Sequence, residues 1–449
     1  MPALALLAVV PVTLAGCGPT GSTGQAIPAD LAPPTAPFPN PLGVYRELGY
    51  IAGDPDFVAV GSFAYLPGPG DSSYAIISLS LPNSTLRFRR DPPDFVARYS
   101  VHVIIGDTAA PAAVLSATEE VRVSTFRETS RRDESVVFQG FLKLVPGEYP
   151  ARMEVRDLAS SANFKREMRI QVPRFGARFV TPPIIVYRAE PRPSRDVPPS
   201  LIVNPRKTLD FAGGKSQIYV ESDSGGDADA ILEIREDGLV ILTDTLAFRP
   251  VAGPLRTATK PLNVTRLPPG ELTLQVRLPG SAEADSTALL VALLPDWVTA
   301  DYQTALSYLR YAGTPAQLDS LANAPPRERA RLLHALWNRK DPVPETSENE
   351  FFERYFRRIR DANDRFGEAD TAGWLTDRGA VYITFGPPDE VLRHLEPGQG
   401  PERSQVWLYD KSLAFELRLV FYDPTATGAY TLTIQSRRAF VEAVQTLYS

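Results

Sequence analysis

Apolar and polar residues alternate with a period of two along much of the chain between residues 57 and 188. The alternation is clearest at 77–81, 99–105 and 168–172, where every second residue is apolar. Because successive side chains of a strand point to opposite faces of its sheet, this pattern predicts half-buried strands, and it places His102 on the exposed face. Turn residues separate such runs, which predicts an antiparallel β-sandwich.

A second strand-rich region follows the proline-rich segment 190–193 and extends from about residue 201 to 295, with a clear alternation at 272–278. The two regions share a local pattern, because LVPGE at 144–148 and LPPGE at 267–271 each lead into a predicted strand. A duplicated immunoglobulin-like unit explains this pattern, and so does the frequent use of Pro-Gly in type II turns.

Three aspartates, Asp223, Asp227 and Asp229, lie close together beside Gly225 and Gly226. Carboxylates in a loop can bind a calcium ion, but this spacing matches no established calcium loop. A polar hairpin tip is therefore the favoured interpretation.

The apolar period changes to about 3.6 from Asp301 onward, which predicts three or four helices. Thr314 with Gln317, and Ser347 with Glu350, have the spacing of capping boxes that begin helices. The second box precedes an apolar stripe that consists of Phe352, Phe356, Ile359, Ala362 and Phe366.

Composition narrows the class of protein. Of the 449 residues, 43% are hydrophobic, which is enough for several domains with cores, and 43 prolines favour short strands over helical bundles. The net charge of −6 provides no general attraction for phosphate backbones, so nucleic acid is not an expected partner. Cys17 is the only cysteine, which excludes an internal disulfide and a cysteine-based zinc site.

The N-terminus has the pattern of a bacterial lipoprotein. Residues 1–16 are uncharged and mostly apolar, too short to span a bilayer but suited to a signal-peptide core. Residues 14–17 (LAGC) resemble a lipobox, and the resemblance implies that Cys17 carries acyl chains that anchor the chain without a transmembrane helix. Gly18 resembles the residue that follows the cysteine in lipoproteins of the outer membrane. The alternative is an apolar N-terminal element with a buried free cysteine.

The most specific motif lies at 373–390 (GWLTDRGAVYITFGPPDE). Gly373, Trp374, Thr376 and Asp377 match the residues that name the GWxTD domain, and the sequence resembles this family over roughly residues 300 to 437. The resemblance implies a secreted or lipid-anchored bacterial protein, and it implies no established activity.

The motif also predicts local structure from its residue types. Thr376 and Asp377 can cap backbone amides, Gly379 can adopt a positive φ, and Trp374 provides a large apolar surface for burial. We therefore expect a turn that begins a hairpin, with a strand over 381–385.

The next segment reads as a turn that leads into a short helix. Gly386 and Pro387 suit the turn, and Asp389 and Glu390 would lie at the positive end of the helix dipole. Strands at 406–409, 413–422 and 430–434 and a terminal helix over 438–447 complete a predicted α+β module.

Weak candidates for catalysis are Asp377, Arg378, Glu390 and His394, which include the residue types of general acid–base chemistry. Glu390 and His394 would share one helix face if the segment were helical. An active site would gather these groups around one open pocket, whereas a scaffold would bury Trp374 and use Asp377 as a backbone cap.

The predicted fold is multidomain and mainly β, with two tandem immunoglobulin-like β-sandwiches, a helical segment and a C-terminal α+β module. We expect a lipid-anchored, non-catalytic binding or assembly scaffold of the bacterial cell envelope, with a protein or polysaccharide partner and no metal or cofactor. The alternative is an envelope hydrolase or transferase. The predicted divisions are a signal peptide (1–16), a tether (17–45), the sandwiches (46–190 and 200–296), the helical segment (297–369) and the GWxTD module (370–449).

Overall fold

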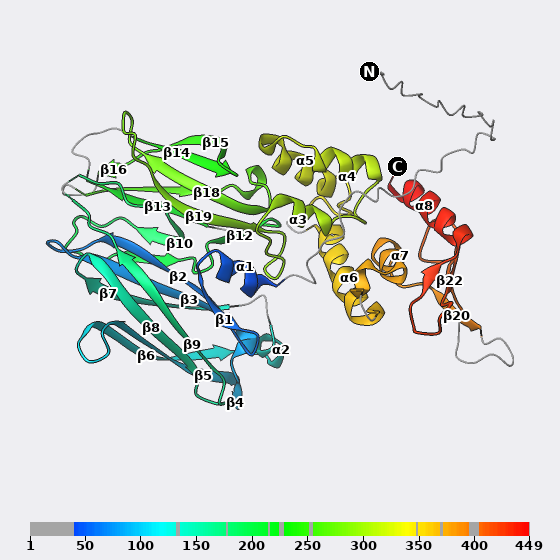
Figure 1. Ribbon diagram of the computed structural model, residues 1–449, viewed down its shortest axis with the longest axis horizontal. Helices are drawn as coiled ribbons and strands as arrows, with labels where there is room; N and C mark the ends of the chain where they lie inside the picture. The colour runs from blue at the N-terminus through cyan, green and yellow to red at the C-terminus, as the bar shows by residue number, and fades with distance from the viewer. Residues whose placement is uncertain are drawn as a thin grey trace, which may run out of the picture.

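The computed structural model describes residues 40–131, 135–176, 178–213, 216–223, 229–250, 255–346, 349–368, 371–394 and 404–448. The β-sandwiches form one end of an elongated molecule, helices occupy its middle, and a small sheet with the last helix forms the other end (Figure 1). This arrangement confirms the predicted multidomain, mainly β fold. The signal peptide, Cys17 and the tether up to residue 39 lie outside the described residues.

The first sandwich follows a short helix, α1 (Pro41–Glu47). One sheet has the order β1 (Ile51–Asp54), β2 (Phe57–Pro67), β3 (Ser73–Pro82), β7 (Ser135–Leu144). The other has the order β6 (Pro111–Val123), β5 (Asp94–Gly106), β8 (Gly147–Asp157), β9 (Asn163–Val172), with β4 (Arg89–Asp91) also beside β5 and α2 (Phe126–Thr129) after β6. Alternate residues of β5 from Tyr99 to Ile105 are buried, and His102 is exposed, as the pattern predicts.

The second sandwich also consists of two sheets. The first has the order β11 (Ser200–Val203), β10 (Ile184–Glu190), β13 (Gln217–Ser222), β17 (Arg256–Pro261), β16 (Arg249–Pro250). The second has the order β12 (Thr208–Asp210), β19 (Asp285–Ala292), β18 (Gly270–Arg277), β14 (Ala230–Glu236), β15 (Leu239–Leu246).

The predicted boundary at residue 190 is wrong by one strand. Strand β10 pairs with β11 and β13 of the second sandwich and not with any strand of the first. The proline-rich segment at 190–193 has the composition of a linker, but it connects two antiparallel neighbours within one sheet.

Both sandwiches have immunoglobulin-type strand order. In the usual lettering, the first pairs its strands as A-B-E and C′-C-F-G, and the second as A-B-E-D and A′-G-F-C-C′. One further strand, β1 in the first unit and β11 in the second, lies outside strand A. The two PGE segments occupy equivalent positions, because each enters strand F, which is β8 in one unit and β18 in the other. Gly270 in the second segment has a φ of +123°, and an added Cβ would lie 3.2 Å from the backbone of Asp301. The topology therefore supports a duplicated unit.

The two sandwiches pack face to face, so that four sheets lie in successive layers (Figure 1). Apolar side chains of β2 and β3 meet those of β10, β11 and β13 in one buried cluster. The side-chain amide of Gln139 on β7 donates to the carbonyl of Leu201 (2.8 Å) and accepts from the amide of Val203 (2.9 Å). These contacts fix one unit against the other.

A buried ion pair lies at the same interface. The Nε atom of Arg192 donates to Oε1 of Glu221 and its Nη2 atom donates to Oε2, each over 2.7 Å. The side chain of Arg192 is 2% exposed and that of Glu221 is 0% exposed. Tyr219 donates to this carboxylate (2.7 Å), and Nη2 of Arg192 also donates to the carbonyl of Pro67 (2.6 Å) at the end of β2. The pair therefore connects both sandwiches.

Asp210, at the end of β12, lies near Arg206 in a polar cavity between the sandwiches. Burial raises the pKa of Asp210 to about 6, the charge of Arg206 opposes the rise, and the charge of Asp296 adds to it. Between the unfolded value of 3.8 and about 6, the folded state binds the proton more tightly. Ionised Asp210 therefore lowers the stability of the fold at neutral pH, and this cost is relieved as the pH falls through 6.

We expect Asp210→Asn to raise the free energy of unfolding by about 1–3 kcal/mol at pH 7, because it removes the cost of the buried charge. At about pH 3.5 the difference from the unmodified chain should shrink to about 0.3 kcal/mol or less, since the carboxyl is then protonated in the folded state and mostly protonated in the unfolded state. Urea unfolding at the two pH values measures the effect. A variant that is less stable at pH 7 would contradict the prediction.

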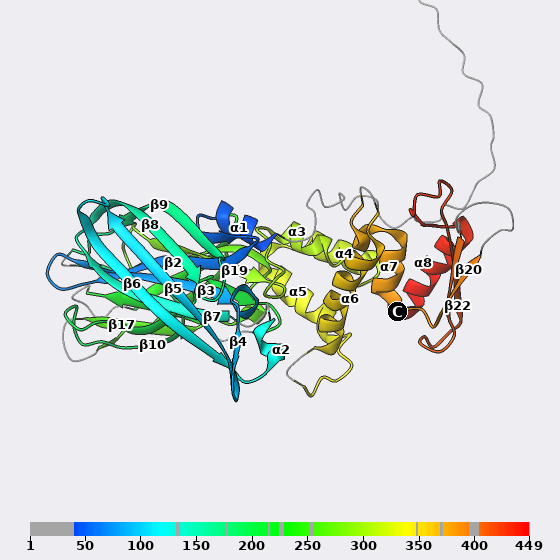
Figure 2. The ribbon, with the colours of Figure 1, turned by 90° about the horizontal axis from the view of Figure 1, so that it is seen from below.

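Four helices, α3 (Tyr302–Ser307), α4 (Pro315–Ala322), α5 (Pro326–Asn338) and α6 (Glu350–Phe366), pack against one end of the second sandwich (Figure 2). The capping box of Thr314 and Gln317 is confirmed at α4. The N-cap of α6 is instead Asn349, whose side chain accepts from the amide of Phe352 (2.9 Å), while Ser347 lies outside the described residues. The apolar stripe of α6 is buried as predicted.

The core of the second sandwich continues into the helices and the C-terminal module without a break. Trp297 marks the passage, because its ring centroid lies 5.0 Å from those of both Tyr308 and Phe356. The predicted division at residue 297 is thus a change of secondary structure within one core.

Candidate functional site

The GWxTD motif forms a turn and the start of a helix. Residues Gly373–Leu375 make one 3₁₀ turn (η3), and α7 (Asp377–Phe385) follows with Thr376 as its N-cap, whose hydroxyl accepts from the amide of Gly379 (3.1 Å). The predicted strand at 381–385 is therefore wrong. Its β-branched and aromatic residues favour a strand in isolation, but this helix is buried on all sides and so needs no polar face.

Close packing explains the two glycines of the motif. An added Cβ on Gly379 would lie 2.0 Å from the carbonyl oxygen of Gly373, and one on Gly373 would lie 2.3 Å from that of Ala362 on α6. Gly379 does not have the positive φ that we predicted. These glycines let α6, η3 and α7 approach one another directly.

Trp374 is fully buried, as a structural role requires. Its ring contacts that of Tyr308 (5.4 Å between centroids), and the guanidinium carbon of Arg310 lies 5.5 Å from its centroid. In the part of the chain that the structure describes, the indole nitrogen has no hydrogen-bond partner. Trp374 therefore acts through packing and by supporting the Arg310 guanidinium.

Asp377 joins α7 to the C-terminal elements β23 (Thr431–Leu432) and α8 (Ile434–Tyr448). Its Oδ2 atom accepts from the backbone amide of Leu432 (2.7 Å) and pairs with the guanidinium of Arg437 (2.5 Å). The predicted contact with a backbone amide is present, and it comes from a strand 55 residues away in sequence.

Arg378 has a similar connecting role. Its Nη2 atom donates to the carbonyl of Gly428 (3.1 Å) and lies 3.5 Å from Oε1 of Glu368. The central carbon of the guanidinium lies 4.5 Å from the centroid of the Tyr430 ring. Burial lowers the pKa of the guanidinium, and Glu368 opposes this shift.

Asp389 and Glu390 lie on the far side of the module. The predicted helix after Pro388 is wrong, because strand β20 (Glu390–His394) pairs there with β21 (Ser404–Tyr409) in a sheet completed by β22 (Leu417–Tyr422) and β23. Asp389 accepts from the amides of residues 410–412, which lower its pKa to about 2. Glu390 and His394 are four residues apart on a strand, which separates them by roughly 13 Å instead of placing them on one helix face. The side chain of His394 lies outside the described residues.

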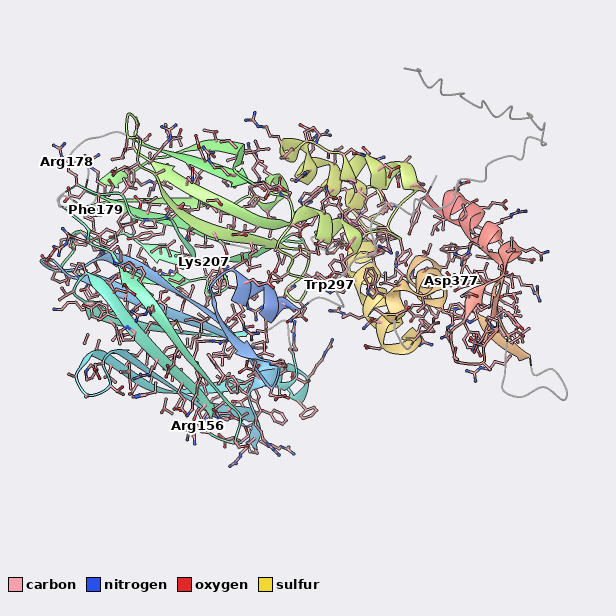
Figure 3. The ribbon with its side chains drawn as sticks, viewed as in Figure 1. Arg156, Arg178, Phe179, Lys207, Trp297 and Asp377 are labelled. Atoms are coloured by element: carbon pink, nitrogen blue, oxygen red, sulfur yellow. The ribbon has the colours of Figure 1, made fainter. Side chains whose placement is uncertain are left out.

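A pocket of about 200 Å³ opens beside the motif, between α4, α7 and α8. Of the predicted site residues whose side chains the structure describes, only Asp377 lines it. Figure 3 labels Asp377 beside the C-terminal elements. Sequence reasoning missed Arg310, Tyr311 and Arg437, because no local spacing relates them to the motif. Burial raises the pKa of Tyr311 to about 12, although nearby Arg310 opposes the rise. The remaining lining residues used below are Leu318, Asp319, Leu375, Phe440 and Val444.

The described residues contain no group of three His, Cys, Asp or Glu side chains that could hold a metal ion. Asp223 and Asp229 belong to this described part, and Asp227 lies outside it. No helix in the described ranges is long and apolar enough to cross a membrane.

Comparison with known families identifies a GWxTD domain over residues 287–445, which confirms the predicted resemblance and extends it upstream into β19. The search of curated proteins gave no match. Among solved structures, a β-glucuronidase from Bifidobacterium dentium, complexed with coumarin-3-O-glucuronide, is similar at 9% identity over 48% of this chain and 39% of that chain. Its TM-score of 0.17 is too low to support any inference about this chain.

Proposed function

We propose that this chain is a non-catalytic binding or assembly scaffold, anchored by lipid in the bacterial cell envelope. One observation carries the scaffold role: Asp377 and Arg378, two of the weak catalytic candidates, hold separate parts of the fold together, and the exposed Glu390 lies apart from them. Asp377 binds β23 and α8, Arg378 binds the loop before β23, and Glu390 begins β20. An acid–base mechanism needs such groups around one reacting atom, and of the candidates with described side chains only Asp377 lines the pocket.

The sandwiches supply surface for a partner. Strand β6 forms an edge of its sheet, is 13 residues long, and is mostly exposed. An exposed edge strand offers backbone amides and carbonyls that an extended partner segment can pair with. A protein partner is therefore favoured over a polysaccharide.

The lipid anchor rests on the lipobox-like sequence at 14–17. Acyl chains on Cys17 would hold the chain at a membrane surface, and the glycine- and proline-rich residues that follow have the composition of a spacer. A tethered binding protein meets its partner at high effective concentration on the same surface.

The experiment compares the unmodified chain with Cys17→Ser in the native host. We expect the unmodified chain in the membrane fraction, with a mass increase from diacylglycerol on Cys17, and the serine variant in the soluble fraction or unprocessed. Chemical crosslinking on intact cells should then recover a defined partner with the unmodified chain and much less with the variant. Equal membrane association of both forms would refute the anchor, and turnover of an envelope substrate that Asp377→Ala abolishes without loss of stability would refute the scaffold.

A further inference from the structure

The pocket beside the motif contains a guanidinium group that the fold holds in place but does not neutralise. Arg310 donates from Nε to the carbonyl of Ser307 (3.3 Å), and Trp374 supports the plane of the group. Its Nη2 atom is buried and has no hydrogen-bond partner among the described residues. The atom has no accessible surface of its own, so the inference rests on the charge of the guanidinium as a whole. Arg310 lines the pocket and has no carboxylate at ion-pair distance among the described residues, so its charge would stabilise an anion bound there.

The other charges of the pocket are accounted for. Arg437 and Asp377 form an ion pair with each other, so together they add no net charge. Asp319 is exposed at the edge of the pocket, where water screens its charge. Arg310 is therefore the group that determines which charge a ligand in the pocket would carry, and it favours a negative one.

The larger part of the pocket's surface is apolar. Leu318, Leu375, Phe440 and Val444 line it, and Phe440 is almost completely buried. The volume of about 200 Å³ lies below the range of roughly 300–1,000 Å³ that is usual for drug-sized ligands. The pocket thus suits a short branched aliphatic group next to an anion.

We propose that this pocket binds an aliphatic carboxylate, with the carboxylate on Arg310 and the aliphatic group against Leu318, Phe440 and Val444. This inference rests on the proposed binding function and specifies one ligand class for it. A carboxylate accepts from a guanidinium through charge-assisted hydrogen bonds, which are stronger than neutral ones. The same chemistry occurs at a peptide C-terminus that ends in leucine and in a free branched-chain acid.

The test is isothermal titration of the full chain with three probes: acetyl-Leu-Leu with a free carboxylate, the same dipeptide as its C-terminal amide, and 4-methylpentanoate. We expect the free-carboxylate dipeptide to bind at least tenfold more tightly than the amide. Binding of 4-methylpentanoate as tight as that of the dipeptide assigns the site to free acids, and binding of the dipeptide alone assigns it to peptide termini. Either result supports the carboxylate site.

Three variants separate ligand binding from folding. Arg310→Gln should lower the affinity for the free-carboxylate dipeptide by about tenfold or more. Val444→Trp should abolish binding, because the larger side chain fills the pocket while Arg310 stays in place. Arg331→Gln is the matched control, because Arg331 lies exposed on α5 in a pair with Glu328. Equal affinity for acid and amide, no saturable binding of any probe, or full affinity in Arg310→Gln would overturn the inference. The scaffold proposal would survive such a failure, since the crosslinking experiment tests it separately.

Discussion

Trp374→Ala is expected to lower the free energy of unfolding by about 3–5 kcal/mol, one of the two largest effects that the structure predicts. The side chain is 0% exposed and lies within the core that the helices share with the second sandwich. Its removal would leave a cavity between Tyr308 and Arg310 and would withdraw support from the Arg310 guanidinium. Urea unfolding followed by circular dichroism measures the change.

Two further variants define the cause of this loss. Trp374→Phe should cost clearly less than the alanine variant, since it retains an aromatic ring and the indole nitrogen has no hydrogen bond to lose within the described part of the chain. Tyr422→Ala, in an exposed position of β22, should change stability by no more than about 0.5 kcal/mol. An alanine variant as stable as the unmodified chain would mean that Trp374 is not part of the core.

Arg192→Met is expected to lower the free energy of unfolding by about 3–5 kcal/mol, because it leaves the charge of Glu221 buried without a counter-charge and with only the hydroxyl of Tyr219 as a side-chain donor. The substitution also removes the hydrogen bond to Pro67 and so weakens the contact between the sandwiches. Urea unfolding again measures the loss.

The double variant Arg192→Met with Glu221→Met should recover much of this stability, since neither buried charge remains. Arg188→Met serves as the control, because its pair with Glu190 is exposed and should contribute no more than about 1 kcal/mol. A double variant as unstable as the single one would show that the ion pair matters for more than charge compensation.

Strands of the outer sheets could be predicted from the sequence because they have one buried and one solvated face. In β5 the alternation of apolar and polar residues maps directly onto burial. The half-buried strand expected at 77–81 is wrong in this respect: β3 lies between the two sandwiches, and Ser78 and Ser80 are buried as well. Helix α7 could not be predicted in this way, because its residues from Gly379 to Phe385 are all buried and provide no polar face from which to read a period. Local propensity then favoured a strand, and tertiary packing overrode it.

The candidate site was only partly accessible to sequence reasoning. The capping role of Thr376 follows from its residue type and position, and the structure confirms it. The support of Arg310 by Trp374 joins residues 64 positions apart, and the contact of Asp377 with Arg437 joins residues 60 apart. Contacts over such separations depend on how the helices pack, which no local spacing expresses.

The GWxTD match begins inside β19, the strand whose neighbours in the sheet are β12 and β18 of the second sandwich. A recombination event that moved only the matched residues to another protein would leave a sheet without one of its inner strands. It would also separate the helices and the C-terminal module from the sandwich residues that share their hydrophobic core. Exchange of this module between genes should therefore include the whole second sandwich, so we expect the two to be inherited as a single unit.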